Sequence, residues 1–254
     1  MISGFAAGFR GGPPRGRGEG RLMDTTLIDR ARSGVGEILD LFSYRSCLAC
    51  DAEIGRRPVP LCRACARALL AERLAAPLAL PALGEDLPGL AGVWAAANYA
   101  SPVRELLLRF KHHCQFAVLP LLDGLFCQRF RRLRGEFAPD VIVPVPRSLL
   151  RFLWRGTDLP GCLAHAVHAR FRVPLLNALA RAPFNARQAR KTKDERLKLP
   201  AGVLRARRPR RLAGRSVLLI DDVLTTGATA LAAVRVLRGA GAARVGVLAL
   251  AHGR

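Results

Sequence analysis

An unbroken apolar run, "VLLI" at residues 217–220, stands directly before two adjacent acids, Asp221 and Asp222. A strand that is apolar at every position is typical of a parallel sheet whose two faces are both covered by helices. In such sheets, ligands bind outside the carboxyl ends of the strands, and the two acids fall at one of these ends. The run therefore predicts an α/β fold with a binding site next to the acids.

Strand-like and helical segments alternate along the rest of the chain, which implies a mostly parallel sheet with right-handed crossovers. The expected strands are 140–146, 173–176, 217–220 and 244–251. The expected helices are 25–42, one from Pro102 with Ser101 as its cap, and 116–133, 160–171 and 228–238. Residues 1–22 are rich in Gly, Arg and Pro and predict a disordered tail, and Met23, which follows them, is an alternative start of translation.

Four cysteines form two close pairs, C-x2-C-x11-C-x2-C, at Cys47, Cys50, Cys62 and Cys65. Such pairs let two turns present four thiolates to one tetrahedral metal, and four sulfur ligands favour zinc or an iron centre. Zinc is the preferred interpretation over iron and over disulfides. With every coordination position filled by protein, the metal would be structural. The other cysteines, Cys114, Cys127 and Cys162, are interpreted as small core residues.

The turn after the two acids, Thr225-Thr226-Gly227-Ala228-Thr229, is expected to open a helix. Free backbone N–H groups and hydroxyls there form a phosphate cradle, and Gly227 lets the backbone approach an anion closely. Adjacent carboxylates repel each other and a phosphate, so they need hydroxyl donors and a cation beside them. A ribose diol with Mg²⁺ supplies both, and the constellation therefore predicts a phosphorylated ribose ligand.

The chain carries a formal net charge of +22, and much of the excess lies between Arg187 and Arg215, where twelve Lys and Arg stand against two acids. This charge attracts polyanions; a nucleic-acid surface and an ordinary solvated basic surface both fit it. The most apolar region, 64–94, is interrupted by charged and proline residues, so no membrane span is predicted. A cytoplasmic location is expected.

The stretch "VLLIDDVLTTGAT" is similar to the phosphoribosyl pyrophosphate signature of type I phosphoribosyltransferases. From residue 45 onward, the chain resembles the ComF/GntX family, in which a four-cysteine zinc module precedes a phosphoribosyltransferase domain. The resemblance implies a helix and zinc module over 23–75 and a type I phosphoribosyltransferase fold, a mostly parallel sheet flanked by helices, over 90–254.

The resemblance also implies roles for individual residues. Asp221 and Asp222 would hold the ribose hydroxyls and Mg²⁺, and residues 225–229 the 5-phosphate. Pyrophosphate would lie near Arg147 and Ser148, which follow "VPVP", and near Lys111. Residues 187–198 would correspond to a loop that closes over the site. The runs at 155–160 and 196–199 lack the amide side chains usual in the family, which puts the acceptor side of the site in doubt.

Three functions remain open on this evidence. The first is an accessory protein of natural competence that binds a phosphoribosyl ligand and handles incoming single-stranded DNA with helicase partners, as the family resemblance implies. The second is an active phosphoribosyltransferase that uses a nitrogen acceptor. The third is a non-catalytic adaptor that binds protein partners or single-stranded DNA. The first is preferred, and no catalytic residue is assigned.

Overall fold

The computed structural model describes residues 44–57, 59–75, 78–80, 87–146, 158–181 and 204–253. The predicted tail and the predicted helix 25–42 lie outside these residues. Within the described part, no helix is long and apolar enough to cross a membrane.

The core of the fold is a five-stranded sheet of order β3-β4-β9-β8-β5. Its strands are β3 (Leu78–Ala79), β4 (Leu90–Asn98), β5 (Val141–Pro144), β8 (Ser216–Leu224) and β9 (Arg244–His252). The pairs β4–β9, β9–β8 and β8–β5 are parallel, and the short β3 joins β4 antiparallel. The predicted mostly parallel sheet is confirmed. Two small antiparallel pairs accompany it, β1 (Tyr44–Ser46) with β2 (Glu53–Arg57), and β6 (Leu179–Arg181) with β7 (Leu204–Ala206).

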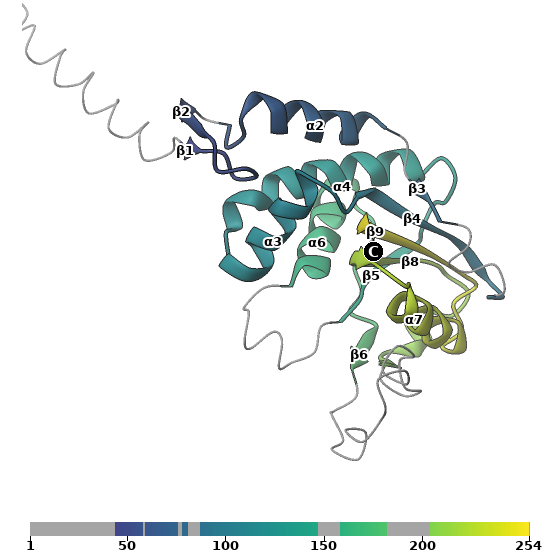
Figure 1. Cartoon of the computed structure of the whole chain (residues 1–254). Coiled ribbons are helices and arrows are strands. Elements are labelled where there is room, and N and C mark those ends of the chain that lie inside the picture. The colour runs from purple at the N-terminus through teal and green to yellow at the C-terminus, as the bar shows by residue number, and fades with distance from the viewer. Residues whose placement is uncertain are drawn as a thin grey trace, which may run out of the picture. The chain divides into compact units, whose positions relative to one another are not determined.

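Helices cover both faces of the sheet (Figure 1). One face carries α3 (Val103–His113), α4 (Leu119–Leu133) and α6 (Leu159–Phe171), and the other carries α7 (Ala228–Gly239). Side chains of β8 alternate between the two cores: Leu218 and Ile220 belong to the first, and Val217 and Leu219 to the second. Burial of all four explains why this strand is apolar at every position.

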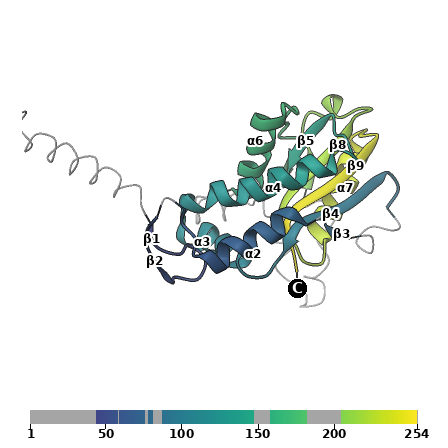
Figure 2. The same cartoon turned by 90° about the horizontal axis from the view of Figure 1, so that it is seen from above.

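A further helix, α2 (Arg63–Leu74), follows the cysteine pairs and lies alongside α4 (Figure 2). Its carboxyl end is held by two arginines of α4. Arg129, only 1% exposed, donates to the Glu72 carbonyl, and Arg132 donates to the carbonyls of Leu74 and Ala75. Positive charge there complements the helix dipole and satisfies carbonyls that have no partner inside the helix.

The structure corrects two local predictions. Helix α3 begins at Val103 with Pro102 at its cap and no side-chain capping bond, so Ser101 is not the cap. Residues 173–176 form no strand: only Leu175 bridges to Ile142. Pro174 has no N–H to donate, which limits this short segment to the bonds from Ile142 N–H to Pro174 O and from Leu176 N–H to Ile142 O.

Candidate functional site

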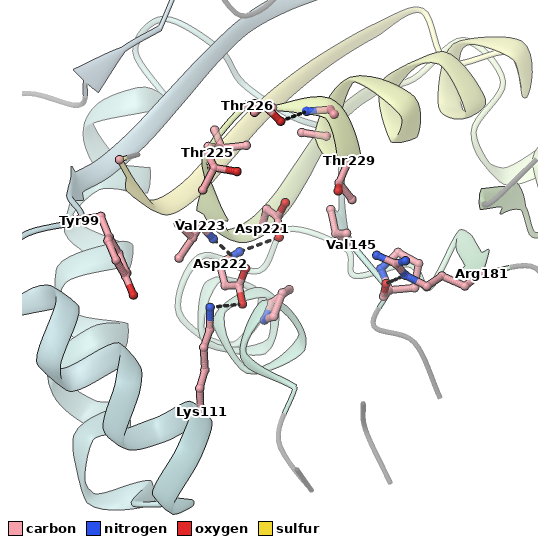
Figure 3. A pocket seen from close by; sticks show the side chains of 17 residues that line it. Tyr99, Lys111, Val145, Arg181, Asp221, Asp222, Val223, Thr225, Thr226 and Thr229 are labelled. Atoms are coloured by element: carbon pink, nitrogen blue, oxygen red, sulfur yellow. Dashed lines mark hydrogen bonds and ion pairs between the residues drawn. The ribbon is translucent and has the colours of Figure 1, made fainter. Parts of the chain in front are cut away.

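The two adjacent acids lie inside β8, because this strand continues to Leu224 and does not end at Ile220 as predicted. Residues that follow one another in a strand point to opposite sides, so the two carboxylates have different surroundings. Asp221 is 8% exposed, whereas Asp222 is more accessible and reaches toward α3 (Figure 3).

A pocket of about 400 Å³ opens at the carboxyl ends of the parallel strands. Residues at or just beyond the ends of β4, β5, β8 and β9 line it, as expected for an α/β sheet. Its walls are Tyr99, Lys111, Val145, Pro146, Pro160, Arg181, residues 221–230 and Gly253. The structure thus brings together Lys111, the two acids Asp221 and Asp222 and the predicted phosphate turn, residues 225–229.

Lys111 enters the pocket from the last turn of α3 (Figure 3). Its Nζ lies 2.8 Å from Asp222 Oδ2, and both side chains are 18% exposed. The lysine that the resemblance places near pyrophosphate therefore neutralises one of the two acids here. An anionic ligand in the pocket would share this lysine with Asp222.

Asp221 is the more deeply buried acid. Its Oδ1 accepts a hydrogen bond of 2.8 Å from the Asp222 N–H. Burial, followed by repulsion from the Asp222 carboxylate, raises the pKa of Asp221 to about 7. Because this pKa lies above the ordinary value, the folded state binds the proton more tightly than the unfolded chain does. The contribution of Asp221 to stability therefore falls as the pH rises from about 4 to about 7.

The turn after β8 leads directly into α7 through Gly227, whose φ of 72° lies in the left-handed region. Thr226 Oγ1 accepts from the Ala228 N–H at 3.4 Å. The first turn of α7 contains no acidic residue, and its remaining N–H groups have no partner within the helix. Together with the hydroxyls of Thr225 and Thr229, this end of the helix can accept an anion.

Two predicted site residues lie outside the described part of the chain, and two further residues line the pocket. Arg147 and Ser148 lie outside the described residues. Arg181 was not predicted; it lines the pocket from β6, and its Nε donates to the Pro146 carbonyl at 2.9 Å. No sequence motif marks it. Tyr99 is an aromatic residue that also lies on the pocket wall (Figure 3).

The four predicted cysteine ligands lie together. The sulfurs of Cys47, Cys50, Cys62 and Cys65 are within 4.8 Å of one another. Cys50 Sγ and Cys62 Sγ are 3.7 Å apart, close to the separation of about 3.8 Å that a tetrahedral zinc–thiolate site requires. The Ala49 and Cys65 N–H groups point to Cys47 and Cys62 sulfurs at 3.4 Å. These donors and distances fit a tetrahedral metal.

The remaining cysteines follow the prediction only in part. Cys127 is buried in α4, and Cys162 is half-buried in α6. Cys114 is exposed at the end of α3, where its φ of 51° ends the helix, so its interpretation as a core residue was wrong.

Part of the basic segment is described by the structure. Exposed arginines gather on β7, on the short 3-10 helix η4 (Pro209–Arg211) and on the bend between them: Arg205, Arg207, Arg208, Arg210 and Arg211. A second cavity of about 530 Å³ is lined by three of them, Arg207, Arg208 and Arg211, together with residues 175–177. The arginines of residues 187–198 lie outside the described part.

The carboxyl-terminal part of the chain matches a known protein family, and a longer part matches a known protein. Residues 163–254, which include β8, the turn and α7, match the phosphoribosyl transferase domain family. Competence protein F of Haemophilus influenzae is 29% identical over 160 residues, which cover 61% of this chain and 70% of that protein.

Two solved structures show a partial similarity to this chain. Adenine phosphoribosyltransferase from Leishmania donovani has 15% identity and a TM-score of 0.40, with 66% of this chain and 86% of that one covered. Glutamine phosphoribosylpyrophosphate amidotransferase from B. subtilis has 21% identity and a TM-score of 0.36 over 50% of this chain, which spans only 25% of that enzyme. Residues 163–254 are thus similar to a phosphoribosyl transferase domain, the chain is similar to competence protein F, and the four-cysteine cluster lies ahead of the matched residues.

Proposed function

We propose that this competence-associated, phosphoribosyltransferase-like protein binds phosphoribosyl pyrophosphate, or a related phosphoribosyl ligand, in the 400 Å³ pocket. The observation that carries the proposal is the junction of β8 and α7. It combines two carboxylates, a glycine-containing turn rich in hydroxyls and an uncapped helix start on one wall of the pocket. A phosphorylated sugar bound with Mg²⁺ needs acids and an anion cradle side by side.

In this arrangement the 5-phosphate occupies Thr225, Thr226, Gly227, Ala228 and Thr229, and the ribose hydroxyls bond to Asp221 and Asp222. Mg²⁺ accompanies the ligand and offsets the charge of the acids. Lys111 faces the pyrophosphate side, for which Arg147 and Ser148 are further candidates. The pKa of Asp221 is raised in the pocket, and bound hydroxyl donors or a cation would stabilise its charged form.

We assign Zn²⁺ to the four cysteines as a structural ion. The four sulfurs lie close enough to share one tetrahedral ion, and all four positions would be filled by protein. Cysteines free of disulfides in the described residues also agree with a cytoplasmic protein.

Transfer of the phosphoribosyl group to a nitrogen acceptor is the alternative use of the same pocket. Tyr99 is an aromatic side chain on its wall on which an acceptor ring can stack. No catalytic residue is assigned in the pocket, so the proposal is one of binding.

Calorimetry with phosphoribosyl pyrophosphate and Mg²⁺ tests the proposal. Wild type is expected to bind one ligand per chain, and Asp221→Asn/Asp222→Asn to bind at least about tenfold more weakly, because amides retain only part of the hydrogen bonding and none of the attraction for Mg²⁺. Asp123→Asn, which changes a half-buried acid of α4 outside the pocket, serves as the control. Absence of wild-type binding, or equal affinity of the double variant, contradicts the proposal.

A second function, binding of single-stranded DNA during its uptake with helicase partners, is favoured by the exposed arginines of β7 and η4. Their cavity has no acidic residue in its lining, which suits a phosphate backbone. The resemblance to competence protein F points in the same direction.

The triple variant Arg207→Glu/Arg208→Glu/Arg211→Glu tests this second function. We expect its affinity for a single-stranded oligonucleotide to fall at least about tenfold, and the slope of log K against log salt to decrease by about two. The control Arg134→Glu/Arg172→Glu/Arg235→Glu makes the same change of net charge at exposed arginines elsewhere. If both triple variants lose affinity equally, net charge and not this cluster drives binding.

A further inference from the structure

Helix α3 contacts the cysteine module with one residue and the ligand pocket with another. Arg109 donates from Nη2 to Oδ2 of Asp51, which directly follows the second cysteine of the first pair. Two residues further along the helix, Lys111 pairs with Asp222 in the pocket. The cysteine cluster and the pocket are therefore joined by two ion pairs on a single turn of helix.

The turn of α3 that carries both ion pairs is tightly packed against its neighbours. Residues 109 and 111 are separated by about 200° around the helix axis, so they point to opposite sides. Phe110 between them is fully buried, and its ring meets Phe116 edge-on with centroids 5.7 Å apart. Leu106 and Leu107 are likewise fully buried. This packing restrains the turn, so a displacement of the helix backbone at Arg109 would also displace the backbone at Lys111.

The position of Asp51 is in turn set by the cysteine loop. Its N–H donates to the Cys47 carbonyl at 3.0 Å, and the Cys47 N–H donates to the Ala52 carbonyl at 2.9 Å. Asp51 has a φ of 60°, a left-handed conformation that this tight loop imposes. The carboxylate that holds Arg109 therefore belongs to the same turn that presents Cys47 and Cys50 to the proposed metal.

We propose that Asp51 and Arg109 are positioning residues for Lys111, and that metal loading of the cysteine cluster and phosphoribosyl binding are coupled through α3. The proposal rests on the proposed function and names its regulation. Coupling of this kind is reciprocal: a metal that favours the ordered loop favours ligand binding, and the ligand favours metal retention by the same factor.

The ion pair between Asp51 and Arg109 is not explained by a contribution to stability. Asp51 is 71% exposed, and exposed ion pairs stabilise proteins little. The Arg109 guanidinium nevertheless donates to the Asp51 carboxylate, so the two groups interact. Arg109 also approaches Gln115 Oε1 at 3.5 Å, a contact within its own segment that would remain if Asp51 changed.

The first test measures affinity in a double-mutant cycle. Asp51→Asn removes the charge with little backbone cost, because asparagine tolerates the left-handed region, and it leaves all four cysteines in place. We expect it to weaken binding of phosphoribosyl pyrophosphate by about three- to tenfold with zinc content unchanged. In a Lys111→Met background the same substitution should have no further effect. Additive effects would overturn the proposal, as would an unchanged affinity; Glu53→Gln, an exposed acid in β2, is the matched control.

The second test needs no ligand. The Val223 N–H donates to Asp222 Oδ1 at 2.7 Å, on the carboxylate whose other oxygen pairs with Lys111. Release of Lys111 should free that carboxylate and speed hydrogen exchange at the Val223 amide. We expect faster exchange in Asp51→Asn and in Lys111→Met, but not in Glu53→Gln. Unchanged exchange in Asp51→Asn overturns the proposal, whereas lack of ligand binding by wild type with the expected exchange pattern contradicts only the proposed function.

Discussion

Gly227→Val is expected to raise the dissociation constant for phosphoribosyl pyrophosphate by about 100-fold or more, a loss of roughly 2.7 kcal/mol. Gly227 occupies the position directly before α7 and has a φ of 72°, a conformation that a β-branched residue scarcely adopts. The substitution therefore distorts the turn that aims the free N–H groups of α7 at the proposed 5-phosphate. It also places two methyl groups where the anion would approach the backbone. Calorimetry with Mg²⁺ present measures the effect.

Gly214→Val is the matched control. This glycine has a nearly equal φ of 70°, an added Cβ there meets no atom within 4 Å, and it lies outside the pocket. Both variants should lose similar stability from backbone strain, which circular dichroism during denaturant unfolding can compare. Only Gly227→Val should lose ligand affinity. Equal affinity of the two variants would place the phosphate away from this turn.

Much of this region could be predicted from sequence because its signals are local. The apolar run, the turn residues and the spacing of α7 all lie within about two dozen consecutive residues, and each has a direct physical reason. The exception is the end of β8, predicted at Ile220 and found at Leu224. Acids inside a strand are unusual by propensity, and here the parallel neighbour β9 pairs with β8 as far as His252 and supports the extension.

Among the elements that were not predicted, β4 and α2 are the longest, and each was missed for a physical reason. Strand β4 reads "LAGVWAAAN", and its alanines are weak strand formers. Ala95, Ala96 and Ala97 are nevertheless fully buried, because β4 lies between β3 and β9 in the sheet and contacts helices α2 and α4. Helix α2 follows directly after Cys62, whose sulfur accepts from the first turn, so the cysteine pattern obscured a helix start.

Pocket residues from distant segments could not be placed by sequence. Lys111 was expected near pyrophosphate from the resemblance, but its pairing with Asp222 depends on how α3 packs on the sheet. Arg181 reaches the pocket only because β6 pairs with β7 beyond the edge of the main sheet. Such contacts join residues separated by 35 positions or more, and no periodic pattern in either segment encodes them.

The pairing of Lys111 also changes how the two acids are understood. As a sequence, "DD" suggests two equivalent carboxylates, yet one is neutralised by a lysine and the other is buried with a raised pKa. At neutral pH the pocket therefore holds less negative charge than two acids suggest. This reduces the repulsion that a polyanionic ligand would meet on entry.

Cys65→Ser is expected to reduce zinc content from about one ion per chain to nearly none, because a serine oxygen is a poor zinc ligand at neutral pH. Cys65 and Leu69 belong to the same core as α4, so loss of the metal should also loosen the packing of α2. Metal binding contributes directly to folding of such modules, and we expect a loss of unfolding free energy on the order of 5 kcal/mol. Metal analysis and denaturant unfolding measure the two effects.

Cys127→Ser separates the metal effect from the cost of placing a hydroxyl in the core. Cys127 is as deeply buried as Cys65 but lies in α4, outside the four-sulfur cluster. It should cost only about 1–2 kcal/mol and leave zinc content unchanged, because its only change is an imperfectly bonded buried hydroxyl. Zinc lost equally from both variants would mean that general destabilisation releases the ion. Zinc absent from wild type purified under reducing conditions would contradict the metal assignment itself.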